Sequence, residues 1–178
     1  MIYFVTGNKG KLEEANAILG DVVGKNIGYV EIQADSLKEV ALFGMKEVLE
    51  RVDDPVMLED AGLFVDGLKG FPGVYSAYVF DTIGNNGILN LMRNVKDRRA
   101  VFRSVLCYAE PGMVPKIFKG EMWGVITNEP RGTGGFGYDP IFEVEGKTLA
   151  EMGTDEKNGI SHRGASIRAL ETWLSARK

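Results

Sequence analysis

The spacing of hydrophobic residues in the first sixty positions predicts strands that alternate with helices. Short apolar runs over residues 2–6, 29–32 and 56–58 are typical of buried strands. Residues 11–19 and 36–52 instead carry apolar side chains at a helical spacing that leaves the opposite face polar. This alternation along the chain indicates an α/β fold.

The second half of the chain has a different pattern. Residues 100–109 and 114–126 predict two longer strands, with a Pro-Gly turn signal between them, so this part is expected to be antiparallel. A last helix is expected to begin after Ser161, a good N-cap residue. The sequence therefore predicts a mixed, twisted sheet flanked by helices. We expect one domain over residues 1–178, with two lobes around a central cleft.

Composition narrows the classes of function. A 44% hydrophobic, 26% charged chain of 178 residues is typical of a soluble globular protein. Its net charge of -4 argues against a broad nucleic-acid surface, which needs a basic excess. We find neither a basic leader nor an apolar run that could span a bilayer, so a cytoplasmic protein without a membrane partner is expected.

The metal chemistry open to this chain is that of oxygen ligands. One cysteine, Cys107, and one histidine make a tetrahedral zinc site improbable and an internal disulfide unattainable. Cys107 is best interpreted as a small apolar residue of a strand. Asp and Glu with Mg²⁺ remain as the metal chemistry that the composition permits.

The turn after the first predicted strand has the composition of an anion site. It consists of Thr6, Gly7, Asn8, Lys9, Gly10 and Lys11. A polar turn between a strand and a helix N-terminus presents backbone N–H groups and the positive end of the helix dipole to an anion. It is not a Walker A loop, because Leu12 stands where Ser or Thr must bind Mg²⁺. A solvated turn is an equally good interpretation of these residues alone.

Acidic residues follow two of the predicted strands. Glu59 and Asp60 come after the apolar run 56–58, and Glu31 lies near the end of another run. Because strand ends in α/β sheets face the ligand crevice, these carboxylates are candidates to hold Mg²⁺ and to activate a water. The alternative is that they cap a helix or pair with lysines.

A glycine-rich stretch, residues 132–140, carries aromatic side chains. Pro140 follows its glycines closely, so no helix can begin there and a dinucleotide-binding fingerprint is rejected. We expect a loop that offers aromatic rings for stacking on a base, with Phe136, Gly137, Tyr138 and Asp139 as contacts. Core aromatics beneath a loop are the alternative.

Three basic or imidazole side chains lie at the start of the last helix. Lys157, His162 and Arg163 precede it or belong to its first turn, where positive charge opposes the helix dipole. That arrangement costs stability unless an anion or another acceptor compensates it. We therefore expect these residues to contact a ligand.

Together these motifs resemble the inosine triphosphate pyrophosphatase (Ham1-like) family. They occur in family order from residue 6 to about residue 165: TGNKGK, a glutamate, EDAGL, GFPGVYSAY, GFGYDP and EKNGISHR. The resemblance implies a Mg²⁺-dependent homodimeric hydrolase that converts non-standard purine triphosphates (ITP, dITP, XTP) to the monophosphate and pyrophosphate.

The resemblance also implies a role for each motif. The turn around Thr6, Asn8 and Lys11 would hold the triphosphate. Glu31 and Asp60 would be linked to Mg²⁺, with Asp60 as general base. Phe136, Tyr138 and Asp139 would bind the base, whose edge Lys157, His162 and Arg163 would recognise. Ala61 departs from the family, where Ser is common, so a hydroxyl contact is lost there.

Two other functions remain open on the sequence. One is a Maf-like pyrophosphatase that acts on modified nucleotides, although the EKNGISHR motif speaks against it. The other is a nucleotide-binding module without catalysis, against which Glu31 and Asp60 argue. No feature supports a nucleic-acid partner.

Overall fold

A seven-stranded sheet runs through the computed structural model, which describes residues 1–177. Its strands are β1 (Ile2–Phe4), β2 (Val22–Gly24), β3 (Val56–Val65), β4 (Arg99–Ala109), β5 (Lys116–Ile126), β6 (Phe142–Val144) and β7 (Lys147–Thr148). Their order is β2-β1-β3-β4-β5-β6-β7. β1 pairs parallel with β2 and β3, whereas β6 pairs antiparallel with β5 and β7. The predicted mixed α/β sheet is therefore confirmed.

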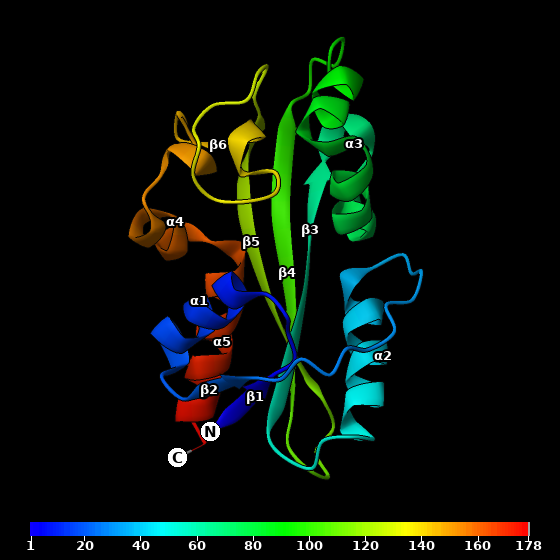
Figure 1. Cartoon of the computed structure of the whole chain (residues 1–178), viewed down its shortest axis with the longest axis vertical. Coiled ribbons are helices and arrows are strands. Elements are labelled where there is room, and N and C mark those ends of the chain that lie inside the picture. Colours follow the sequence, from blue (N-terminus) through cyan, green and yellow to red (C-terminus); the bar gives the residue numbers. More distant parts are fainter. Residues whose placement is uncertain (178) are drawn as a thin grey trace. The chain divides into compact units, whose positions relative to one another are not determined.

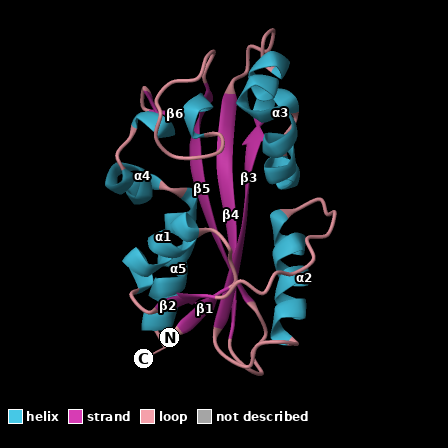
Figure 2. Ribbon diagram, viewed as in Figure 1, coloured by secondary structure: helices cyan, strands magenta, loops and turns pink. Residues whose placement is uncertain are grey.

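Five α-helices of the described chain flank this sheet (Figure 2). They are α1 (Lys9–Leu19), α2 (Leu37–Leu49), α3 (Ser76–Leu91), α4 (Thr154–Ile160) and α5 (His162–Ser175). Local signals set their ends. The Ser36 hydroxyl accepts a hydrogen bond from the Glu39 N–H at 3.3 Å and caps α2, and Gly20 ends α1 with a left-handed φ of 79°. The last helix follows Ser161, as the sequence predicts.

The chain divides into two compact units. Unit 1 comprises Met1–Ala61, Ser104–Gly120 and His162–Lys178, and unit 2 comprises Gly62–Arg103 and Glu121–Ser161. β3, β4 and β5 contribute residues to both. Two lobes are thus present, whereas the cleft and the single domain over the whole chain stay predictions.

Unit 1 has helices on both faces of its strands. α1 and α5 lie side by side against one face, and α2 lies on the other (Figure 1). Between α1, α5 and the sheet lies a layer of buried apolar side chains: Phe4, Ala15, Val22, Met57, Leu106, Tyr108, Ile167 and Leu170. α2 buries the stripe that its periodicity predicts, including Val40, Met45 and Val48.

Unit 2 has its own core beneath α3. Its buried residues are Leu63, Val65, Val79, Ile88, Met92, Ala100, Met122, Ile126, Tyr138, Ile141, Phe142 and Leu149. The Tyr138 hydroxyl donates a hydrogen bond to the Ser76 carbonyl oxygen at 2.7 Å, so the buried polar end of this ring has a partner. The glycine-rich loop 132–138 is thereby tied to the core of unit 2.

The predicted strand over residues 29–32 is wrong. The strand that follows α1 is β2, and residues 25–34 have no regular secondary structure. Within this segment the Val30 N–H donates to the Glu47 carboxylate of α2 at 2.7 Å. A side chain therefore supplies a backbone partner that a neighbouring strand supplies in a sheet. Glu31 consequently lies in an irregular segment and not at a strand end.

The strand predicted over residues 56–58 is longer than expected. β3 continues to Val65, so Glu59 and Asp60 lie within the strand and not after it. The apolar run ends at Leu58, but the strand continues because Glu59 has ionic partners inside the fold, described below. The charged residues at positions 59 and 60 were therefore wrongly interpreted as the end of this strand.

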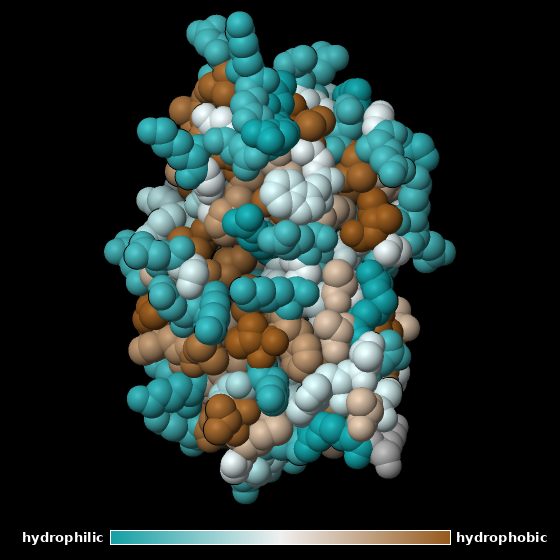
Figure 3. Space-filling model, turned by 180° about the vertical axis from the view of Figure 1, so that it is seen from behind, coloured by the Kyte–Doolittle hydropathy of each residue, from teal (hydrophilic) through white to brown (hydrophobic). Residues whose placement is uncertain are grey.

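Hydrophilic side chains are spread over the face of the molecule in Figure 3, with hydrophobic groups scattered among them. Such scattering is normal for a protein surface. No helix among residues 1–177 has both the length and the apolar character needed to cross a membrane.

A test of the unit 1 packing is the substitution Gly120→Ala. A Cβ atom at this buried position of β5 would overlap the backbone carbonyl oxygen of His162, at the start of α5. Because backbone must shift to relieve such overlap, we expect a loss of about 1–3 kcal/mol in the free energy of unfolding by urea. Gly159→Ala is the matched control, since its Cβ would have open space in α4. Equal stability of the two variants would contradict the close approach of β5 and α5.

Candidate functional site

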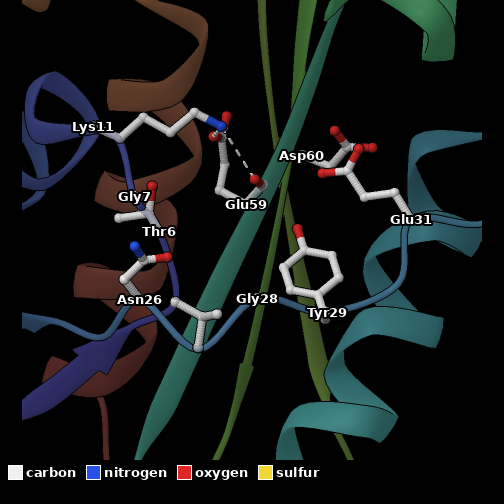
Figure 4. Close-up of a pocket in the computed structure, with 10 residues that line it drawn as sticks. Thr6, Gly7, Lys11, Asn26, Gly28, Tyr29, Glu31, Glu59 and Asp60 are labelled. Carbon is white, nitrogen blue, oxygen red and sulfur yellow. Dashed lines mark hydrogen bonds and ion pairs between the residues drawn. The ribbon is translucent and has the colours of Figure 1, made fainter.

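A pocket in unit 1 gathers the acidic residues and part of the turn over residues 6–11, whose Asn8, Lys9 and Gly10 are not among the lining residues (Figure 4). It is lined by Val5, Thr6, Gly7, Lys11, Asn26, Gly28, Tyr29, Glu31, Glu59 and Asp60. These residues come from the end of β1, from α1, from the irregular segment 25–34 and from β3. The structure thus brings together residues that the sequence assigned to two separate motifs.

The turn before α1 has the cap expected of an anion site. Asn8 is the N-cap residue, and its side-chain oxygen accepts a hydrogen bond from the Lys11 N–H at 3.1 Å. The Asn8 N–H in turn donates to the Thr6 hydroxyl at 3.1 Å. The helix begins at Lys9, so Lys9, Gly10 and Lys11 form its first turn, where free N–H groups and the helix dipole favour an anion.

The Lys11 side chain reaches from α1 to β3. Its Nζ lies 2.8 Å from a carboxylate oxygen of Glu59 and donates to the Glu59 carbonyl oxygen at 3.3 Å. The side chain is still 22% exposed, so part of the ammonium faces the pocket. One positive charge is therefore held at the pocket wall, beside the turn that precedes α1.

Glu59 is the centre of a buried ionic network. Its fully buried carboxylate contacts Lys11, accepts from the Ser104 hydroxyl at 2.8 Å and accepts from Arg163 Nε at 3.2 Å. Burial raises the pKa of this carboxyl, but the charges of Arg163 and Lys11 outweigh burial and hold it well below its usual range. Both carboxylate oxygens of Glu59 thus have partners within the fold.

Arg163 has partners inside the protein. Its Nη1 lies 3.1 Å from Glu14 of α1 and its Nε 3.2 Å from Glu59, and its side chain is 8% exposed. These two carboxylates offset the unfavourable position of Arg163 at the N-terminus of α5. These carboxylates supply the compensating negative charge that the sequence analysis expected from a ligand. The contact of Arg163 with a purine edge stays a prediction.

Asp60 and Glu31 form the acidic side of the pocket. Asp60 follows Glu59 along β3, so the two side chains point in opposite directions, and Asp60 extends toward Glu31 (Figure 4). Burial, followed by the negative charge of Glu59, raises the pKa of Asp60 to about 7 against the opposing charge of Lys11, and Glu31 adds to the rise. A cation at this position would relieve that repulsion.

The donor set fits a hard cation that keeps other ligands. Residues 1–177 contain no group of three His, Cys, Asp or Glu side chains arranged to hold a metal. Mg²⁺ commonly takes one or two carboxylates and completes its shell with waters and substrate phosphates. Asp60 and Glu31 therefore suit Mg²⁺ bound together with a phosphate ligand better than a closed metal cage.

Tyr29 is a pocket residue that the sequence reasoning missed. Its hydroxyl points into the pocket toward the acidic side chains (Figure 4). Burial, followed by the charges of Asp60 and Glu31, raises its pKa well above the usual range, so the phenol stays protonated and can donate. The strand predicted over residues 29–32 hid the place of Tyr29 in this loop. Asn26 and Gly28 also line the pocket, and no local sequence signal marked them.

The second set of predicted residues lies in unit 2. Phe136 is 53% exposed, and Lys157 Nζ lies 4.5 Å from the centre of its ring. Asp139 is buried, and the same carboxylate oxygen contacts Lys157 Nζ and accepts from the Phe136 N–H at 2.8 Å. Gly135 allows this turn, since a Cβ there would overlap the Asp139 carboxylate. The loop thus presents one exposed ring with an ammonium over it.

One expectation about this region needs correction. The loop was expected to display two aromatic rings, but Tyr138 is 4% exposed and packs in the core of unit 2. Lys157 belongs to unit 2, whereas His162 and Arg163 belong to unit 1, and their contact with a base stays a prediction. His162 is buried at the first position of α5.

Comparison with known proteins gives a consistent result. The model of the Ham1 family matches residues 2–173. A "dITP/XTP pyrophosphatase" of Thermococcus kodakarensis is 54% identical, covering 96% of this chain and 95% of the relative, and that of Pyrococcus horikoshii is 50% identical, covering 97% and 96%. The solved structure of the Staphylococcus aureus Ham1 protein has a TM-score of 0.89 and 32% identity, covering 99% of each chain.

A first prediction concerns the buried network around Glu59. Arg163→Met leaves Glu14 and Glu59 with less compensation, so we expect a loss of about 3–5 kcal/mol in the free energy of unfolding at pH 7. The deficit should shrink as the pH falls toward 4.5 and below, because protonation then neutralises the stranded carboxylates. Arg177→Met, which removes an exposed pair with Glu110, is the control, with an expected cost of about 0–1 kcal/mol. A similar cost for both would show that the network is not stabilising.

A second prediction concerns Asp60 in protein kept free of metal with EDTA. Its carboxyl pKa is about 7 in the folded protein and 3.8 in an unfolded chain. Ionisation of Asp60 therefore destabilises the fold as the pH rises from 3.8 to 7. Asp60→Asn should therefore be more stable than the parent by about 1–3 kcal/mol at pH 8, with no gain at pH 4. Asp53→Asn, at an exposed position of unit 1, controls for the substitution itself. A gain that does not depend on pH would contradict the assignment of charge to Asp60.

Proposed function

Because the chain belongs to the Ham1 family, we propose that it hydrolyses non-standard purine nucleoside triphosphates, namely ITP, dITP and XTP, to the monophosphate and pyrophosphate. The activity for which its relatives are named, dITP/XTP pyrophosphatase, supports this reaction. The observation that carries it is the pocket of unit 1, where an anion-binding helix start and Lys11 face the carboxylates of Asp60 and Glu31. Together these groups suit a polyphosphate bound with a cation.

The triphosphate is assigned to the turn before α1. The first-turn N–H groups of α1 and the Lys11 ammonium supply positive potential at the wall opposite Asp60 and Glu31 (Figure 4). Thr6 and Gly7 line the same wall. These residues bind and orient the phosphates, and Lys11 stabilises negative charge that develops on them during cleavage.

Asp60 and Glu31 would hold Mg²⁺. When bound, the cation neutralises phosphate charge and polarises the scissile linkage. The family resemblance also assigns Asp60 the role of general base, which accepts a proton from the attacking water. With no cation in the pocket, burial and the neighbouring carboxylates raise the pKa of Asp60 to about 7. Tyr29, a protonated donor in the same pocket, orients oxygen ligands there.

Base recognition is assigned to the exposed ring and its neighbours. Phe136 offers a face for stacking, and the Lys157 ammonium beside it is a donor for the 6-oxo group that inosine and xanthosine carry. A donor such as Lys157 disfavours the amino groups of adenine and guanine, because two donors cannot pair. The family resemblance also implies His162 as a donor to the base. The homodimer, which rests on the resemblance, and the cytoplasmic location, expected from the sequence, also belong to this proposal.

The test is pyrophosphate release from ITP, XTP, GTP and ATP, with Mg²⁺ and then with EDTA. We expect release from ITP and XTP in Mg²⁺, a kcat/KM lower by about 10⁴ for ATP and GTP, and no release in EDTA. Comparable kcat/KM for GTP and ITP would contradict the base assignment. Full activity in EDTA would contradict the role of Mg²⁺.

Two variants separate catalysis from folding in the same assay. Asp60→Asn should lower kcat for ITP by about 10²–10⁴, the usual contribution of a general base, without loss of stability. Asp53→Asn should keep the parental kcat. If Asp60→Asn retains kcat, the role of Asp60 in the chemistry is wrong.

A further inference from the structure

The pocket depends on a segment that lacks regular structure. Residues 26–31, the pocket segment, supply Asn26, Gly28, Tyr29 and Glu31 to the lining. Backbone N–H and C=O groups in such a segment need partners outside a sheet ladder. The partners determine where Tyr29 and Glu31 lie.

α2 and the turn after it supply these partners from one face. Gly44, Glu47 and Arg51 are spaced three and four residues apart, so they follow one another along the same side of the helix. Arg51 donates to the carbonyl oxygens of Ile27 at 3.4 Å and Gly28 at 3.1 Å. We call these three residues the α2 face.

The other two residues of the α2 face act nearer to Glu31. The Glu47 carboxylate accepts from the Val30 N–H at 2.7 Å. Gly44 lies beneath the Tyr29 ring, and a Cβ there would come within 2.5 Å of a ring carbon. The contacts therefore fall before, at and after Tyr29, and the last is one residue from Glu31.

Glu31 itself is exposed, so its surroundings do not restrain it in the way that burial restrains Glu59. The bond from Glu47 to Val30 fixes the adjacent peptide, and the contacts of Arg51 fix the segment two residues earlier. The Arg51 guanidinium also donates to the Glu47 carbonyl oxygen at 3.3 Å, which ties the two anchors together. A shift of about 1 Å in a catalytic group can cost about 10²-fold in rate.

We propose that Gly44, Glu47 and Arg51 are positioning residues, which hold the pocket segment so that Glu31 and Tyr29 face Asp60. None of the three lines the pocket itself. The inference rests on the proposed function for the identity of the reaction. The placement of the pocket segment can be measured independently of that reaction.

The main experiment compares Glu47→Ala with Glu47→Gln. The alanine variant removes the acceptor for the Val30 N–H, whereas glutamine keeps a side-chain oxygen and should rescue it. Hydrogen exchange of residues 25–35 is measured first, since it reports the segment without substrate or metal. We expect exchange about tenfold faster in Glu47→Ala and close to the parent in Glu47→Gln. Glu50→Ala, on the same helix, is the matched control.

Metal binding and activity are then measured on the same proteins. Mn²⁺ titration followed by electron paramagnetic resonance should show weaker binding in Glu47→Ala and Arg51→Ala, and the Mg²⁺ concentration for half-maximal pyrophosphate release from ITP should rise about tenfold. At saturating Mg²⁺ the KM for ITP should change less than twofold. Lys46→Ala, at an exposed position of α2, controls for lost positive charge.

Gly44→Ala separates positioning from general stability. A Cβ atom at this position would come within 2.5 Å of a Tyr29 ring carbon, so the ring must shift, and we expect a raised Mg²⁺ requirement. The melting temperature is measured on the same variant. A lowered melting temperature with a parental Mg²⁺ requirement would indicate a purely structural role for Gly44.

Two results would overturn the proposal: unchanged exchange of residues 25–35 in Glu47→Ala, or a parental Mg²⁺ requirement in all three variants of the α2 face. Absence of pyrophosphate release from the parent protein would instead overturn the proposed function, while the exchange and Mn²⁺ results would still stand.

Discussion

The architecture of unit 1 depends on the compensation of one buried carboxylate. Glu59 lies on β3 with no exposed side-chain surface, and an isolated charge in that position would cost several kcal/mol. Its partners come from three other elements: Lys11 of α1, Ser104 of β4 and Arg163 of α5. The network thus fixes the start of both helices relative to the strand that carries Asp60. Buried apolar side chains also hold α1 and α5 against the strands of unit 1.

The alternation of a strand gives consecutive residues opposite functions. Glu59 points to one face of β3 and is neutralised within the fold, whereas Asp60 points to the other and remains without a cationic partner of its own apart from the influence of Lys11. The pKa of one carboxyl is lowered and that of its neighbour is raised. This separation of environments lets the same dipeptide supply a structural anion and a chemically active one.

The sequence predicted those features that local physics decides. The Ser36 cap, the start of the last helix after Ser161 and the polar turn around Asn8 follow from short-range signals, and all lie where they were expected. Tertiary contacts decide the rest. The partners of Arg163, the burial of Tyr138 and the place of Tyr29 depend on residues up to 149 positions apart, which no local pattern reveals. The strand assigned to residues 29–32 was wrong, and the Val30 N–H within it donates to the Glu47 side chain of α2 and not to a neighbouring strand.

The ion pair between Lys11 and Glu59 has a consequence for how an anion enters the pocket. An anionic ligand that binds the Lys11 ammonium replaces the Glu59 carboxylate as its counter-ion. The ammonium is already partly desolvated by Glu59, so ligand binding does not require the desolvation of a free lysine. The carboxylate left behind is not stranded, because Arg163 and Ser104 still contact it. The exchange favours ligands with a charge density greater than that of a carboxylate, which a polyphosphate chain has and a neutral or singly charged metabolite lacks.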